Sequence, residues 1–205
     1  MRGKVIVDRV AAYLTLFMIL LQICVYLGSW VVSAIYPESM IRPILGSEGL
    51  RWLFSSFIDN ISTHVLVWII LCGMAFGLMR NSELLRVAAS WKKQTGYEHM
   101  ALAVVLWELL AIIIILIILA FIPHAILSSA MGTLFPSSFS VGIVPIITIS
   151  VGLMSITYGC IAGNFRSIES VFNSMVNGIT LCAPFIITYM FCMELYSSVL
   201  WIFGF

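Results

Sequence analysis

Two carboxylates stand inside long apolar runs of the sequence, where ionisable residues are rare. Glu108 follows the last polar cluster by about ten residues, or roughly 15 Å along a helix. Glu194 lies in the last apolar run, among Tyr189, Tyr196 and Ser197. A carboxylate at the centre of a bilayer costs about 2.5–3.5 kcal/mol on insertion scales, so such residues usually face a bundle interior or a wet cavity.

These carboxylates allow different interpretations. In a functional interpretation, Glu108 is a proton-coupling site or a polar contact to another subunit. In a structural interpretation, it is a protonated side chain bonded to a neighbouring helix. Glu194 fits a structural bond to a nearby hydroxyl better than a transport role. Both are candidate intramembrane polar sites.

Two prolines, Pro145 and Pro184, fall inside apolar runs and are further candidates. Proline removes a backbone hydrogen bond and kinks a helix. Transporters line substrate sites with such interrupted helices, although ordinary membrane helices also contain proline. Gly142 and Gly152 around Pro145 strengthen the case for that position.

Other chemistry finds little support in the sequence. No nucleophile-elbow, P-loop, HExxH or dinucleotide motif is present, so we expect no enzyme and no cofactor. His64 and His124 flank apolar runs without a Cys, Asp or Glu at metal-ligand spacing, which predicts no metal site. The five cysteines lie in apolar runs and read as small buried hydrophobes.

The composition indicates whether the surface of this chain faces water or lipid. Its 205 residues are 62% hydrophobic and 9% charged, and a soluble domain carries about 25% charge. A surface with so little charge must face lipid, and the partner we expect first is the bilayer. A net charge of +1 gives no reason to expect nucleic acid.

The apolar runs predict an all-α integral membrane protein, a single membrane domain over residues 1–205. Each run is long enough to cross about 30 Å of hydrocarbon as a helix. The five predicted spans lie near residues 10–35, 63–80, 101–122, 141–162 and 179–203. A surface helix is expected just before the last span, after a polar return at residues 163–167.

An amphipathic helix is predicted at residues 48–61. Ser47 would be its N-cap and Glu48 would lie in its first turn, where the helix dipole favours a carboxylate. One face is apolar and Trp52 suits the headgroup level, so we interpret the helix as interfacial. Packing on another helix of the bundle is the alternative.

The distribution of Lys and Arg predicts the orientation. A cytoplasmic N-terminus places eight basic residues inside and leaves two, Arg42 and Arg51, outside. The eight are Arg2, Lys4, Arg9, Arg80, Arg86, Lys92, Lys93 and Arg166. We therefore expect a multi-pass protein of the inner (plasma) membrane.

Two blocks of the chain resemble the aminobenzoyl-glutamate transporter (AbgT) family. The first is residues 45–85, with GSEGLRWLFSSFIDNIS and GMAFGLMRNSELL. The second is residues 101–205, with MGTLFPSSFSVGIVP and YGCIAGNFRS as its most specific motifs. The resemblance implies a membrane transporter.

The resemblance also has gaps. The family's chains are more than twice as long, and they carry hairpin-containing segments between the two blocks and beyond residue 205. We therefore expect a short form of the family, and no substrate residue is carried over from it.

Two functions follow as expectations. The first is a reduced transporter of aromatic or anionic metabolites, proton-coupled through Glu108. The second is a non-transporting scaffold subunit of a larger membrane complex. Intramembrane polar groups favour helix association, so both predict a homo-oligomer or a larger assembly.

Overall fold

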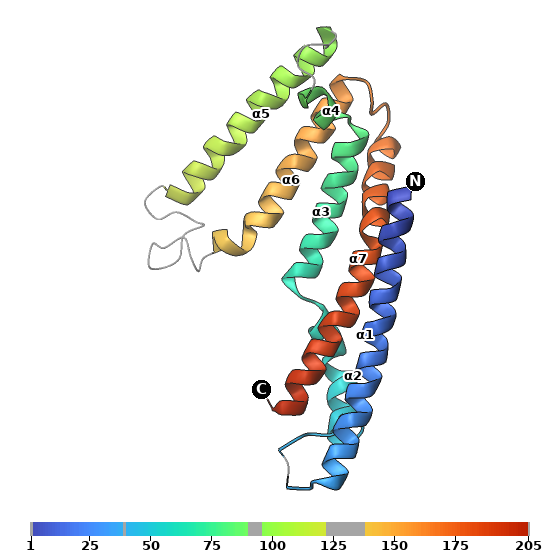
Figure 1. Cartoon of the computed structure of the whole chain (residues 1–205). Coiled ribbons are helices and arrows are strands. Elements are labelled where there is room, and N and C mark those ends of the chain that lie inside the picture. The colour runs from blue at the N-terminus through green and yellow to red at the C-terminus, as the bar shows by residue number, and fades with distance from the viewer. Residues whose placement is uncertain (1, 39, 90–95, 122–137, 205) are drawn as a thin grey trace. The chain divides into compact units, whose positions relative to one another are not determined.

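The protein is built of helices. The computed structural model describes residues 2–38, 40–89, 96–121 and 138–204 (Figure 1). These residues form α1 (Arg2–Ile35), α2 (Ser47–Ile61), α3 (His64–Asn81), α4 (Leu84–Ala89), α5 (Gly96–Phe121), α6 (Ser138–Ile161) and α7 (Ile168–Phe203).

Five of these helices are long and apolar enough to cross a membrane. They are Val5–Ile35, His64–Asn81, Gly96–Leu119, Gly142–Ile161 and Ile168–Phe203. This confirms the predicted all-α membrane fold and its five apolar helices.

The last helix differs from the prediction because the expected surface helix and the last span are one element. α7 runs without a break over 36 residues, about 54 Å at the rise of an α-helix. Its start is capped by Ser167, whose Oγ accepts a hydrogen bond from the backbone N–H of Ser170 at 3.3 Å. Gly178 lies in the interior of α7 and does not end the amphipathic segment.

The chain forms two compact units. One comprises residues 1–69 and 182–205, and the other comprises residues 70–181. Both α3 and α7 contribute to each unit. The expectation of a single domain over the whole chain stays a prediction.

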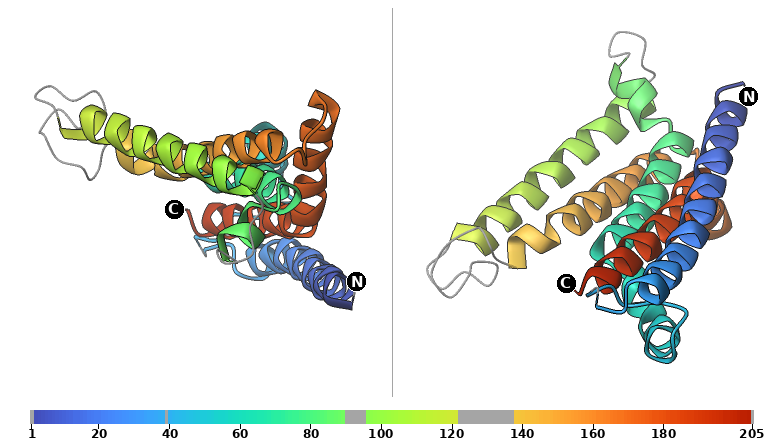
Figure 2. Two further views of the ribbon diagram at one scale, coloured as in Figure 1. Left: turned by 90° about the horizontal axis from the view of Figure 1, so that it is seen from above. Right: turned by 60° about the horizontal axis from the view of Figure 1, so that its bottom comes forward.

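The first unit contains α1, α2 and the second half of α7. Within this unit α1 and the second half of α7 run parallel, side by side, as Figures 1 and 2 show, and their side chains bond at Thr15–Thr188 and Tyr26–Ser198. α2 runs antiparallel to α7, and the loop after α1 is tied to the end of α7 by a bond from the Arg42 N–H to the Ile202 carbonyl.

The structure corrects the predicted N-cap of α2 and shows what this helix packs against. Its N-cap is Gly46, which has no side chain to make a capping bond, and Ser47 is the first helical residue. α2 packs on α7, with the rings of Trp52 and Trp201 stacked at 5.4 Å. α2 therefore packs on another helix, as the alternative interpretation expected. Its position at the membrane interface stays a prediction.

The second unit has a small apolar core between α4, α5 and α6. Tyr158 of α6 is 1% exposed, and it clusters with Val87, Ala101, Leu102 and Val105. α5 and α6 run antiparallel (Figure 1). Within this unit α3 and α7 approach closely, because Gly73 and Gly77 of α3 meet Gly178 of α7.

Candidate functional site

Glu194 is the most deeply buried carboxylate among the described residues. Its side chain is 4% exposed, although it lies on a helix whose outer surface is apolar. Asn60 of α2 donates a hydrogen bond from Nδ2 to Glu194 Oε2 at 3.3 Å. Glu194 Oε1 is buried and has no hydrogen-bond partner in the described part of the chain. One carboxylate oxygen is therefore held in place while the other remains free to accept a bond.

This carboxylate lies in the wall of a cavity between α1, α2 and α7. The cavity measures about 300 Å³, and an adjoining cavity of about 430 Å³ shares four of its lining residues. The shared residues are Gln22, Tyr26, Phe57 and Glu194. The other walls are apolar, formed by Ile19, Ile23, Ile61, Met190 and Phe191, and by Leu53, Phe54 and Ile58. An apolar and aromatic cavity with a few convergent polar groups is typical of a small-molecule site.

The polar side of the cavity comes largely from α1. Gln22 donates from Nε2 to the Tyr26 hydroxyl at 2.6 Å, and that hydroxyl lies 3.2 Å from Ser198 Oγ. Sequence reasoning did not assign these residues to a site. The available signal was spacing, because Thr15, Gln22, Tyr26 and Ser29 recur at helical intervals on one face of an otherwise apolar run.

Pro184 belongs to the same unit as Glu194 but does not line the cavity. It lies inside α7, which continues as a helix on both sides of it. Thr188 donates from Oγ1 to the Pro184 carbonyl at 2.9 Å, and Thr15 Oγ1 lies 2.9 Å from Thr188 Oγ1. The structure thus gives Pro184 a place at the contact between α1 and α7.

Glu108 and Pro145 belong to the second unit. Glu108 is half-buried, and it shares with Ala101 and Val105 the face of α5 that packs on α6. Its Oε2 atom is buried without a hydrogen-bond partner in the described residues. Pro145 lies within a continuous α6, where Thr148 donates to the Val144 and Pro145 carbonyls at 2.8 and 3.0 Å. The four candidates are therefore divided equally between the two units.

The remaining candidates show no ligand cluster. No group of three or more His, Cys, Asp or Glu residues could hold a metal within the described ranges. His64 is the exposed first residue of α3, and His124 lies outside the described residues.

The expectation of buried cysteines is wrong. Cys24, Cys72, Cys160 and Cys192 are exposed on the surface of the chain, and Cys182 is half-buried. The physical reason is that the outer surface of a membrane helix is as apolar as its packed face, so an apolar run does not report burial.

In the described residues, five helices long and apolar enough to cross a membrane define a multi-pass membrane protein. The model of the AbgT transporter family matches residues 77–202, which is more than half of the chain. The chain belongs to this family, and the family resemblance stated above is confirmed. No curated protein and no solved structure matched it.

The family match covers only some of the residues that form the cavity. The matched segment includes Glu194 together with Glu108, Pro145 and Pro184. It does not include α1 and α2, which supply Gln22, Tyr26 and Asn60.

Membership of a transporter family is consistent with a chain that is not an enzyme.

Proposed function

We propose that this protein carries a small aromatic metabolite across the membrane, with the cavity around Glu194 as its binding site. The observation that carries the proposal is the free, buried Oε1 atom of Glu194 in the wall of an apolar cavity. A buried polar atom without a partner is costly, and a solute that donates a hydrogen bond would remove that cost.

The cavity walls favour an aromatic solute over an anionic one. Phe57, Phe191 and Tyr26 line the site, and the described residues that line the two cavities include no Lys or Arg. Recognition of an anion usually relies on an Arg or Lys partner. Of the two solute classes expected from the sequence, the aromatic class is therefore the better supported.

Proton coupling belongs to Glu108 in this proposal. Its half-buried carboxyl group lies in the middle of an apolar helix, with Oε2 unbonded in the described residues.

The test is uptake of radiolabelled aromatic solutes by proteoliposomes that contain the purified chain. We expect concentration-dependent, saturable uptake. Glu194→Gln keeps the acceptor for Asn60 but removes the negative charge, so it should lower uptake about ten-fold or more. Glu108→Gln should leave solute binding intact and abolish uptake driven by a pH gradient.

The matched control is Glu169→Gln, which changes an exposed carboxylate in the first turn of α7. This variant should transport like the unmodified chain. Proteoliposomes with intact protein and no saturable uptake of any aromatic solute would overturn the proposal.

The alternative function is a scaffold subunit of a larger membrane complex. It is favoured by the partial exposure of Glu108, because a carboxyl group that faces hydrocarbon is expensive without a protein partner. A pull-down from native membranes, followed by blue-native electrophoresis, separates the two functions. A stoichiometric larger partner would support the scaffold, and self-association alone would support the transporter.

A further inference from the structure

Two buried side-chain oxygens of the second unit have no hydrogen-bond partner in the described residues, and they belong to helices that pack on each other. They are Oε2 of Glu108 on α5 and Oγ of Ser155 on α6. Ser155 is 0% exposed, and Glu108 is half-buried. Buried polar groups in proteins are nearly always hydrogen-bonded, so two unpaired ones at a single interface call for an explanation.

The packing of α5 on α6 places the two residues at one level. The helices are antiparallel, and Val105 of α5 and Tyr158 of α6 belong to the same buried cluster (Figure 1). Glu108 lies three residues after Val105, about 4.5 Å along α5. Ser155 lies three residues before Tyr158, about 4.5 Å along α6 and in the same direction, because the helices are antiparallel. Both residues are therefore one turn beyond the cluster.

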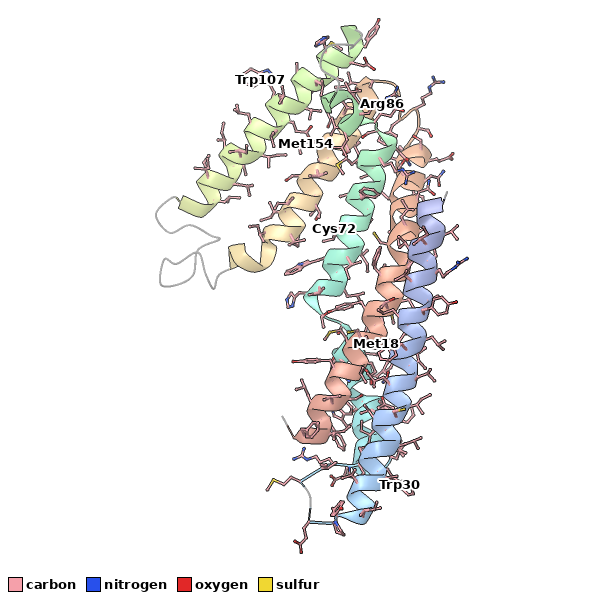
Figure 3. All side chains as sticks on the ribbon, in the orientation of Figure 1. Met18, Trp30, Cys72, Arg86, Trp107 and Met154 are labelled. Carbon is pink, nitrogen blue, oxygen red and sulfur yellow. The ribbon has the colours of Figure 1, made fainter. Side chains whose placement is uncertain are left out.

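The two residues also share the side of each helix that faces this interface. Positions three apart are neighbours on the surface of a helix, so each residue adjoins the cluster member one turn away. Met154, which precedes Ser155, packs against the same cluster, whereas Trp107, which precedes Glu108, is 71% exposed. Figure 3 shows Met154 and Trp107 at a similar level of α6 and α5.

The described helices of this cluster offer Glu108 no free charged partner. α6 contains no acidic or basic residue. Its Tyr158 is buried in the cluster, and its Cys160 is exposed. α4, which joins the cluster through its own apolar residues, carries Arg86, whose guanidinium bonds to Glu83 at 3.1 Å. A hydroxyl group is therefore the partner that α6 can provide.

Ser155 is a buried hydroxyl of α6 that remains available. Thr148 donates to the Val144 carbonyl and Ser150 donates to the Ile146 carbonyl, both at 2.8 Å. Ser155 Oγ makes no such bond in the described part of the chain. A hydroxyl oxygen can accept a hydrogen bond from a protonated carboxyl group, whose O–H is a donor.

We propose that Ser155 is the positioning residue for Glu108: when Glu108 takes up a proton from the aqueous phase, its new O–H group donates a hydrogen bond to Ser155 Oγ. The O–H donor in an apolar interface needs an acceptor, and Ser155 is the unpaired one on the facing helix. The two atoms are not bonded in the structure, so this bond belongs to the protonated state. The inference rests on the proposed function, in which Glu108 couples transport to protons, and it adds the partner that receives the carboxyl group.

Infrared difference spectroscopy tests the pair on the full chain in lipid nanodiscs, with spectra at acid pH compared with spectra at alkaline pH. The C=O band of protonated Glu108 is the one that Glu108→Gln removes. Ser155→Ala should shift this band to higher frequency, because the carboxyl group loses a hydrogen bond. Should Ser155→Ala not fold, Ser155→Cys, which keeps a weaker acceptor, should shift it less in the same direction.

The matched control is Ser150→Ala, which removes a hydroxyl that is bonded within its own helix. It should leave the Glu108 band and the uptake unchanged. In proteoliposomes, Ser155→Ala should lower uptake driven by a pH gradient about ten-fold, while solute binding stays the same, because the protonated carboxyl group is no longer held in place.

These measurements separate the pair from the proposed function. An identical Glu108 band in Ser155→Ala and the unmodified chain would overturn the inference, as would the absence of that band at every pH at which the chain stays folded. A shifted band without any uptake would support the pair and refute transport. Uptake that depends on Glu108 but not on Ser155 would refute the pair while transport stands.

Discussion

The effect of Glu108 on the stability of the fold can be measured by replacing its side chain. Its Oε2 atom is buried without a hydrogen bond in the described residues, on the face of α5 that packs on α6. Replacing an unbonded buried polar group by an apolar one of similar size is neutral or stabilising, whereas a bonded group loses about 1–3 kcal/mol of stability on such a change.

We therefore expect Glu108→Leu to raise the thermal midpoint of the detergent-solubilised protein slightly, or leave it unchanged, and to abolish uptake driven by a pH gradient. Thermal unfolding followed by circular dichroism measures the first effect. Ile112→Leu, one turn further on the same face, is the control and should change neither property. A fall of several degrees in Glu108→Leu would show that the carboxyl group makes a stabilising bond.

At the scale of elements, the crossing of α3 and α7 in the second unit depends on glycine. A Cβ added to Gly178 would lie 2.8 Å from the Gly77 backbone and would collide with the Gly73 carbonyl oxygen. A Cβ on Gly77 would likewise collide with the Ser174 carbonyl. Backbone cannot yield as a flexible side chain can, so this packing excludes any side chain.

Gly178→Ala should accordingly destabilise the protein by about 1–3 kcal/mol, because the two helices must separate. Gly28→Ala is the matched control, since a Cβ on Gly28 of α1 meets nothing within 4 Å. That variant should be neutral or slightly stabilising, as alanine is the better helix former. Equilibrium unfolding in mixed micelles compares the two, and equal stability would contradict the crossing.

At the scale of the whole molecule, charge placement predicts the topology. If the N-terminus is cytoplasmic, eight basic residues lie on the cytoplasmic side and two on the other, so we expect α1 to start in the cytoplasm. If each of the five apolar helices crosses the membrane, we expect the end of α7 on the outer side.

An alkaline phosphatase fused after Phe205 should therefore be active, and a green fluorescent protein at the same position should be dark. Reporters placed in residues 90–95 should show the opposite pattern. A green fluorescent fusion after Phe205, with no phosphatase activity at that position, would refute this orientation.

Local features of the sequence were enough to predict the five apolar helices and the family. Hydropathy and helical length are properties of continuous stretches of sequence, so no tertiary contact is needed to recognise them. For the same reason the bounds of α2 were predicted within one residue. The family match over residues 77–202 rests on motifs that are likewise continuous.

Tertiary structure decided which of these features form a site. Asn60 meets Glu194 across 134 residues of sequence, and α1 closes the same cavity with Gln22 and Tyr26. From the sequence, Gly178 could have ended a surface helix. In the structure it lies inside a continuous α7, where the backbone of α3 leaves no room for a side chain. An apolar run also looks the same whether it faces lipid or protein, which is why the exposure of the cysteines was not predicted. Such pairings depend on how distant helices pack, and that information is not local to any one stretch of the chain.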